Sequence, residues 1–420
     1  MAIISALLLV WLGCSGALWL WRRELFSRTW HEPYVAGLAL VIESDDWGPG
    51  ESFHTERLDG LSGLLGRYSD STGRTAMLTA GMVLAAPDTR AIREKGYSSY
   101  VRRYLDRGFE LLLEAFRRAM QAGTLVPQLH GLEHYYGEGL IRLAAANDER
   151  VLKAFRHDEW SDWESLDSPL QGHYVDGTRL PTTPLPRHEQ QETVNAAAMA
   201  FQRMFGISSS STVAPCYLWN DTTESIWYEH GIRFIQTAGY RCAGRGEDRT
   251  YIQDKQLIRP GDQNDLGQVY LVRNAMYEPV DGRGDDSCMS EIKQAQRQGL
   301  PAVISMHRYN FTRSRREYEM ALAGLDRLLS TTAISFQPIR YLSSPELGAW
   351  FAGDDNPITD PVTGKSWPEL RSLTGLEKTG AFLFRLWYRH AKLRLVTLVT
   401  GLIIPLGIFA LSSQLWRRFT

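Results

Sequence analysis

Two adjacent carboxylates and two histidines four residues apart are the side chains in this chain best suited to catalysis. Asp45 and Asp46 close an apolar run that begins near residue 36. His130 and His134 follow a second apolar run. One carboxylate and two imidazoles can hold a divalent metal, which we expect to be zinc, and leave coordination positions open as in catalytic sites. The remaining carboxylate could act as a base on a water held by the metal, which indicates metal-assisted hydrolysis.

Each pair also has a simpler explanation. An Asp-Asp pair can be a solvated loop or a helix cap, and two histidines can lie on the surface. However, each pair ends an apolar segment that is typical of a strand, at 36–42 and at 125–129. The carboxyl ends of parallel strands collect catalytic residues in α/β barrels, so we expect the pairs to lie together.

Two further apolar segments fit the same plan. The segment 300–306 is typical of a buried strand and ends at His307, with Arg308 next. The segment 213–221 is short and is interrupted by Pro215. We expect Asp221 or Thr222 to cap the helix that follows it.

With these motifs the chain resembles the NodB-type polysaccharide deacetylases, the carbohydrate esterases of family four, from about residue 36 to about residue 347. Their first motif ends in Asp-Asp, their second is His-x3-His, and a later motif ends in a histidine after a strand. The resemblance implies that Asp46, His130 and His134 bind the metal. It implies that Asp45 is the general base and His307 the general acid, on an irregular (β/α) barrel.

The middle motif of that family, Arg-x-Pro-aromatic, is only partly matched. Pro215 and a displaced aromatic, Tyr217, are present, but the arginine that normally steadies the catalytic aspartate is missing. Arg273 or Arg308 could replace it from another strand. A backbone N–H near Cys216 is a candidate donor to the oxyanion, together with the metal.

The segment 156–187 is rich in aromatic residues and proline and has no clear period. An insertion of this length is usually a functional or a disordered loop. Its aromatic residues, Trp160 and Trp163 among them, favour an ordered lid whose rings stack on sugars, or equally a loop packed on the barrel.

Residues 2–21 and 395–416 carry no charge, and each segment is long enough to cross the ~30 Å hydrocarbon core. The alternatives are a cleaved signal peptide for the first and a buried core helix for the second. We therefore divide the chain into a transmembrane helix (1–21), a deacetylase-like domain (22–384), and a basic juxtamembrane segment with a second transmembrane helix (385–420).

The basic residues that flank these two segments lie mostly on the domain side: Arg22, Arg23, Arg28, Arg385, Arg389, Lys392 and Arg394. The positive-inside rule then places the domain on the cytoplasmic face of the cell (inner) membrane. Exported glycans, the substrates of most similar proteins, favour the periplasmic face instead.

The rest of the composition narrows the function class. A formal net charge of -2 without a long basic patch argues against nucleic acid as a partner. The four cysteines are widely spread, so free thiols are expected, with a Cys216–Cys242 pair as the extracytoplasmic alternative. Strands at 232–236, 269–273 and 339–342 alternate with helices at 100–122, 190–205, 289–297 and 315–329, which is typical of a parallel α/β fold.

The sequence thus favours a membrane-anchored hydrolase that removes N-acetyl or other N-acyl groups from amino sugars. Its partners would be a polysaccharide or lipid-linked glycan, the membrane, and candidate exopolysaccharide biosynthesis proteins. One alternative is a catalytically inactive glycan-binding or assembly protein on the same barrel. Another is a non-haem iron enzyme, because two histidines and one carboxylate also suit Fe(II).

Overall fold

A computed structural model of the chain describes residues 2–156, 158–254, 257–354, 358–359, 366–404 and 408. Within them, a nine-stranded sheet has the order β12-β9-β8-β5-β2-β1-β14-β13, with β15 also paired to β1. Every pairing in it is parallel, which confirms the predicted α/β class. Its strands are β1 (Leu38–Trp47), β2 (Leu78–Met82), β5 (Leu125–Leu129), β8 (Ser211–Val213), β9 (Phe234–Thr237), β12 (Val269–Val272), β13 (Ala275–Met276), β14 (Ala302–His307) and β15 (Ile339–Leu342).

Strand β1 is the centre of this sheet. All ten of its residues are buried, as expected for a strand that is covered on both faces. It pairs with β14 along one edge, while β15 and then β2 share the other edge. The register with β14 places Asp45 directly opposite His307.

The two ends of the sheet meet at one short connection. Only Arg273 and Asn274 separate β12 from β13. The Arg273 N–H donates to Thr237 O on β9, and the Asn274 N–H donates to Val303 O on β14. These two successive residues thus bond to β9 and β14, which lie near opposite ends of the strand order. The sheet is therefore curled, and its two ends meet at Arg273 and Asn274, which we call the seam. The carboxyl ends of its strands therefore surround one opening at the end of the curled sheet, which we call the mouth.

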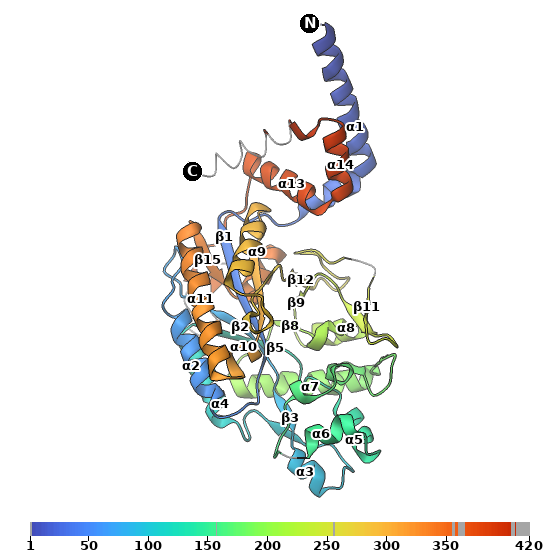
Figure 1. Ribbon diagram of the computed structural model, residues 1–420, viewed down its shortest axis with the longest axis vertical. Helices are drawn as coiled ribbons and strands as arrows, with labels where there is room; N and C mark the ends of the chain where they lie inside the picture. The colour runs from blue at the N-terminus through green and yellow to red at the C-terminus, as the bar shows by residue number, and fades with distance from the viewer. Residues whose placement is uncertain are drawn as a thin grey trace.

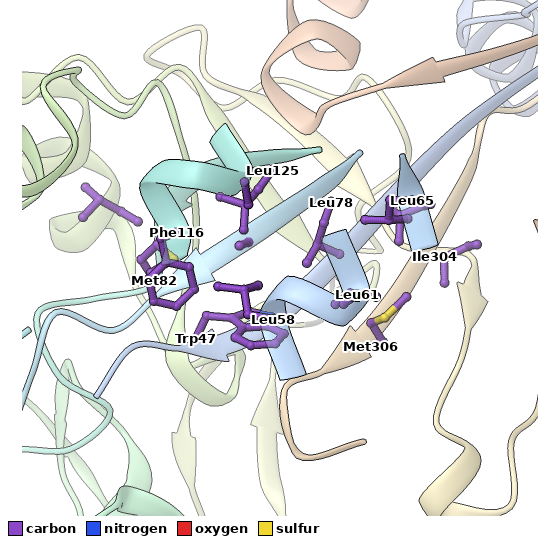
Figure 2. Close-up of a cluster of buried hydrophobic side chains, with 14 of the residues drawn as sticks. Trp47, Leu58, Leu61, Leu65, Leu78, Met82, Phe116, Leu125, Ile304 and Met306 are labelled. Carbon is purple, nitrogen blue, oxygen red and sulfur yellow. The ribbon is translucent and has the colours of Figure 1, made fainter. Parts of the chain in front are cut away.

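Helices cover the outside of the curled sheet (Figure 1). Leu58, Leu61 and Leu65 of one of them, α2, pack against strand residues such as Leu78 and Ile304 (Figure 2). The helices around the sheet are α2 (His54–Leu65), α4 (Glu110–Gln121), α7 (Arg187–Phe205), α8 (Asp221–Glu229), α9 (Asp285–Arg297), α11 (Arg315–Ser335) and α12 (Ser344–Ala352).

Shorter elements lie mostly in the loops. The short helices are α3 (Thr89–Glu94), α5 (Gly137–Ala145), α6 (Glu149–Phe155) and α10 (Tyr309–Thr312), with 3-10 turns at η1 (Trp163–Ser165), η2 (Ser168–Gln171), η3 (Pro215–Tyr217) and η4 (Pro279–Asp281). Four two-stranded pairs are β3 (Ala85–Pro87) with β4 (Arg102–Tyr104), β6 (Val175–Asp176) with β7 (Thr183–Pro184), β10 (Cys242–Arg245) with β11 (Tyr251–Gln253), and β16 (Ile358–Thr359) with β17 (Ser366–Trp367).

Several element predictions were close, and two were wrong in detail. The helix predicted at 190–205 is α7, and Gly206 ends it with a left-handed φ of +74°. The helix predicted at 100–122 begins only at Glu110, because the chain first forms β4 and then turns at Gly108 (φ +137°). Helix α8 is capped by Asn220 rather than by Asp221 or Thr222, because the Asn220 side chain accepts the Thr223 N–H.

The aromatic segment 156–187 is folded. It contains η1, η2 and the β6–β7 pair, and it buries Trp163, Leu170 and Tyr174. One of its residues, His157, lies outside the described residues. Trp163 and Leu170 belong to an apolar cluster with residues of α3, α5 and α6, so this segment is packed against neighbouring elements.

The chain begins with a long apolar helix, α1 (Ala2–His31), whose regular geometry is interrupted at Arg22. Among the described residues, one helical segment, Ser5–His31, is long and apolar enough to cross a membrane. Two more helices, α13 (Gly375–Arg389) and α14 (Ala391–Val399), pack near α1 (Figure 1).

The second predicted span, 395–416, is not seen as a continuous helix. Helix α14 ends at Val399, and Gly401 adopts a left-handed φ of +70°. Residues 405–407 and 409–416 of that span lie outside the described residues. All four cysteines are free, as predicted, and Cys216 is not bonded to Cys242.

Candidate metal and catalytic site

Asp46, His130 and His134 come together as one buried group at the mouth of the sheet. The Nε2 atoms of His130 and His134 lie 3.1 Å and 3.3 Å from Asp46 Oδ1. One ligand atom from each residue can be chosen so that all three lie within 4.8 Å of one another. Both histidines belong to the loop after β5 and not to a helix. The donor set and its burial fit a divalent cation such as zinc.

A bulge at the end of β1 brings both aspartates into the site. In a regular strand, Asp45 and Asp46 would point to opposite faces of the sheet. Asp46 instead has a φ of +71°, and the register between β1 and β2 shifts between Ser44 and Trp47. Such a bulge redirects a side chain, so Asp46 reaches the histidines while Asp45 also faces the mouth.

Neighbouring groups orient the two histidines. The His130 Nδ1–H donates to Val213 O at 2.9 Å, which directs Nε2 towards Asp46. Burial alone would lower the pKa of His130, but the bond to Asp46 and the charges of Asp45 and Asp46 outweigh it and raise this pKa. His134 stacks on Trp163, with ring centroids 5.7 Å apart. Burial lowers the pKa of His134 to about 4, so this imidazole is neutral at pH 7. Burial alone would raise the pKa of Asp46, but the histidines outweigh it and hold this pKa below its usual range.

Asp45 is held by a two-pronged ion pair with Arg273. The Arg273 Nη1–H and Nη2–H groups donate to Asp45 Oδ2 at 2.6 Å and to Asp45 Oδ1 at 2.8 Å. Burial alone would raise the pKa of Asp45, but Arg273 outweighs it and lowers the pKa. Asp45 therefore remains an ionised carboxylate. Of the two arginines that the sequence offered for this role, the structure selects Arg273.

Arg273 also binds other buried groups from the seam of the sheet. Its Nε–H donates to Glu43 Oε2 at 2.5 Å, and its Nη1–H donates to the Tyr217 hydroxyl at 2.9 Å. Glu43 is fully buried, and its other oxygen accepts a hydrogen bond from Ser344 Oγ. One guanidinium thus contacts two buried carboxyl groups, and burial, which Arg273 only partly offsets, raises the pKa of Glu43.

Replacing Arg273 by methionine should lower the free energy of unfolding by about 3–5 kcal/mol, because the buried Asp45 carboxylate loses its cation and buried Glu43 loses a hydrogen-bond donor. Urea unfolding followed by circular dichroism measures this loss. Arg67→Met is the matched control, since Arg67 and its partner Asp326 are exposed and such a pair contributes about 0–1 kcal/mol. Equal losses in both variants would contradict the role given to Arg273.

His307 faces the site from β14 and is paired with a buried glutamate. Its Nδ1–H donates to Glu278 Oε1 at 2.6 Å, and its ring stacks on Tyr309. Burial alone would lower the pKa of His307, but the bond to Glu278 and the nearby carboxylates raise it to about 9. His307 therefore carries the proton that a general acid must donate at neutral pH.

Activity that needs protonated His307 should fall as the pH rises through the pKa of this imidazole, which Glu278 and the nearby carboxylates raise to about 9. Glu278→Gln should move this alkaline limb down, towards the ordinary histidine value of about 6.5. The measurement is kcat against pH for both enzymes, with the exposed Glu247→Gln as control. An alkaline limb that does not move in Glu278→Gln would show that this pair does not set the proton donor.

Arg308 and Trp163 lie beside the group of Asp46, His130 and His134. Buried Arg308 lies with its guanidinium carbon 4.5 Å from the Trp163 ring centroid, and it binds Asp162 and Pro49 O. Trp163 is 1% exposed, so its ring packs on His134 and Arg308. Trp160 is only partly buried and rests edge-on against another ring. Sugar stacking by the two tryptophans stays a prediction.

The predicted oxyanion segment lies on the 3-10 turn η3. Cys216 and Tyr217 both have positive φ angles, of 55° and 54°. Within the described part of the chain, no hydrogen-bond acceptor is found for the Cys216 N–H. Burial raises the pKa of Cys216 to about 11, so its thiol stays protonated. Pro215 begins the turn and is buried. Donation to an oxyanion from this turn stays a prediction.

Several supporting residues escaped the sequence analysis. Gly81 on β2 leaves room for Asp45, since a Cβ there would lie 2.9 Å from Asp45 Oδ1. Buried Glu133 binds Tyr100 and Arg102 and so braces the loop that carries the histidines. His173 holds the same loop through two backbone groups. In the sequence, these supporting residues are indicated only by Glu43, a charged residue at the end of an apolar strand segment.

No protein-family model matches this chain, and no curated protein matches it. Solved structures do give similarities. A family 4 carbohydrate esterase from Streptomyces lividans in complex with acetate is 11% identical, with 80% of this chain and 100% of that chain covered and a TM-score of 0.35. A peptidoglycan N-acetylglucosamine deacetylase is 11% identical, with 75% and 90% covered and a TM-score of 0.37. A family 4 pseudoenzyme from Bacillus anthracis is 10% identical, with 74% and 65% covered and a TM-score of 0.34. The assignment of a function therefore rests on the geometry of the site.

Proposed function

We propose that this protein is a metal-dependent hydrolase that removes an N-acetyl group from an amino sugar of a glycan, on an irregular (β/α) barrel of the NodB deacetylase type. One observation carries the proposal. An arginine-held carboxylate and a protonated imidazole lie opposite each other on adjacent strands, beside a group of two histidines and one carboxylate. A base, an acid and a metal group are the parts that amide hydrolysis needs.

Asp46, His130 and His134 would hold the ion, which when bound supplies Lewis acidity to a water and to the acetyl carbonyl. Asp45 accepts a proton from the attacking water, whose oxygen bonds to the acyl carbon. His307 donates a proton to the sugar nitrogen as the C–N bond breaks, so acetate and a free amine leave. The Cys216 N–H is the proposed further donor to the developing oxyanion.

The test uses the purified full-length chain in detergent. Metal analysis should find a divalent ion, with zinc expected, and acetate should be released from an N-acetylglucosamine oligomer. Glycan binding without acetate release would instead favour an inactive glycan-binding protein. Oxygen consumption that depends on bound iron would favour an oxidative iron enzyme and overturn the hydrolase.

We also propose that α1 anchors the enzyme in the cell membrane. The length and apolar character of Ser5–His31 support this proposal, although a signal sequence has the same character. Three of the seven basic residues that favour a cytoplasmic domain also have a structural role. Arg28, Arg385 and Arg389 form ion pairs with Asp262 or Glu32 of the same chain, so their positions have a structural reason independent of the membrane.

A further inference from the structure

We propose that the catalytic mouth acts on glycan strands in the aqueous space away from the bilayer and cannot reach a sugar attached directly to a membrane lipid. This inference rests on the proposed function and on the anchoring role of α1. It names the substrate class: a soluble or long glycan strand rather than a short lipid-linked sugar.

The direction of β1 sets the distance between the membrane helix and the mouth. Helix α1 ends at His31, and β1 begins at Leu38, at the amino end of the sheet. The site lies at the other end, because Asp45 and Asp46 close β1. At ~3.4 Å per residue, the eight steps from Leu38 to Asp46 span about 27 Å.

The other strands agree with this direction. All are parallel to β1 or to its neighbours, so the histidines that end β14 and follow β5 lie on the same side as Asp46. In Figure 1 α1 leaves one end of the long axis of the molecule, whereas α3, α5 and α6 lie at the opposite end. The mouth and the membrane helix are thus at opposite ends of the sheet.

A buried ion cluster fixes the domain to the end of α1. The carboxylate of Glu32 accepts hydrogen bonds from Arg259, Arg385 and Arg389, at 2.9 Å, 2.9 Å and 2.6 Å. Arg385 is fully buried and also donates to Gln298 O at the end of α9. The cluster therefore ties α1, α13, α9 and the segment before β12 into one unit.

Packing of apolar side chains strengthens this joint. Trp30 of α1 lies edge-on against Phe382 of α13, with centroids 5.3 Å apart. The Arg385 guanidinium carbon lies 3.8 Å from the centroid of the Tyr34 ring, just before β1. A membrane-spanning helix tilts on average by about 20° from the bilayer normal. These contacts fix the domain to the part of α1 that follows the irregular residue Arg22, and they hold the mouth on the side away from α1.

The experiment places the full-length protein in lipid nanodiscs and measures acetate release from three substrates. They are a soluble N-acetylglucosamine pentamer, N-acetylglucosamine joined by one phosphate to a lipid of the same nanodisc, and that sugar on the same lipid through a long flexible poly(ethylene glycol) spacer. The soluble and the spaced substrates should react. The directly joined sugar should react at least about tenfold more slowly, because its tether cannot span the gap.

A measurement in detergent shows whether a slow rate comes from the distance to the bilayer or from the chemical structure of the lipid-joined sugar. When dispersed in detergent, the directly joined lipid sugar should react like the soluble pentamer. Equal rates for the directly joined sugar and the pentamer in nanodiscs would overturn the inference and leave the proposed function standing. No acetate from any substrate, with or without detergent, would overturn the proposed function itself.

A distance measurement tests the same geometry without activity. A fluorophore at Lys95, exposed after α3, should transfer little energy to acceptor dyes in the lipid headgroups. A fluorophore at Arg297, exposed at the end of α9 near α13, should transfer much more. Equal transfer from the two positions would show that the domain lies on its side against the bilayer and would overturn the inference.

Discussion

Replacing both His130 and His134 by alanine should remove the bound metal and lower the rate of acetate release by at least ~10³-fold, because the metal contributes several kcal/mol of transition-state stabilisation. Only Asp46 would remain, and one carboxylate without imidazole partners does not hold zinc against water. Metal content by mass spectrometry and kcat/KM on an N-acetylglucosamine oligomer are the measurements.

The matched control is His188→Ala, because His188 is exposed on α7 and is not part of the group that could hold the metal. It should keep both the metal and the activity. Circular dichroism should show that the double variant remains folded. A folded double variant that keeps its full metal content would show that the ion binds elsewhere.

Replacing Asp45 by asparagine should lower kcat by about 10²–10⁴-fold while the metal content stays unchanged, because a positioned base is lost and the ligands remain. The amide keeps the shape of the carboxylate but cannot take the proton of the attacking water. Asp46→Asn should give the opposite pattern, with weaker metal binding as its first effect. Titration with a zinc indicator separates the two variants.

The exposed Asp265→Asn serves as the control for a general effect of removing one negative charge. It should match the wild type in both measurements. If Asp45→Asn lost the metal and Asp46→Asn kept it, the roles of the two aspartates would have to be exchanged.

The grouping of Asp46 with His130 and His134 could be predicted, because it depends only on where each residue lies relative to a strand in the sequence. Residues that end or follow parallel strands meet at one edge of a sheet, so spacing along the chain was enough to join Asp46 with His130 and His134. The bulge at Asp46 could not be predicted. In a regular strand, side chains alternate between the two faces, so one of the two aspartates would point away from the mouth. Only the shifted register of β1 with β2 shows how both aspartates face it.

The arginine that holds the base could be narrowed to two residues but not chosen from the sequence. Arg273 and Arg308 both follow strands that read as buried. Only the closure of the sheet brings Arg273 onto Asp45, while Arg308 turns towards Trp163 and Asp162. Buried Glu43 also favours Arg273 over Arg308, because Glu43 accepts a hydrogen bond from the Nε–H of the Arg273 guanidinium.

The sequence analysis interpreted the basic residues near the two predicted spans only as signals of membrane topology. The structure gives Arg385 and Arg389 another role, because both bind the buried Glu32. Charge counting along a sequence cannot distinguish an arginine that meets lipid headgroups from one that joins two parts of a fold.

If the proposed activity needs the pair of Asp45 and Arg273, the seam at Arg273 and Asn274 should also set the point in folding at which activity appears. Asp45 and Arg273 are 228 residues apart in sequence, and contacts of such long range form late, because a long loop must close first. Until β12 and β13 have both found their partners, the base has no counter-ion and Glu43 remains uncompensated. The onset of activity during refolding should therefore report the final closure of the sheet rather than the earlier formation of its helices.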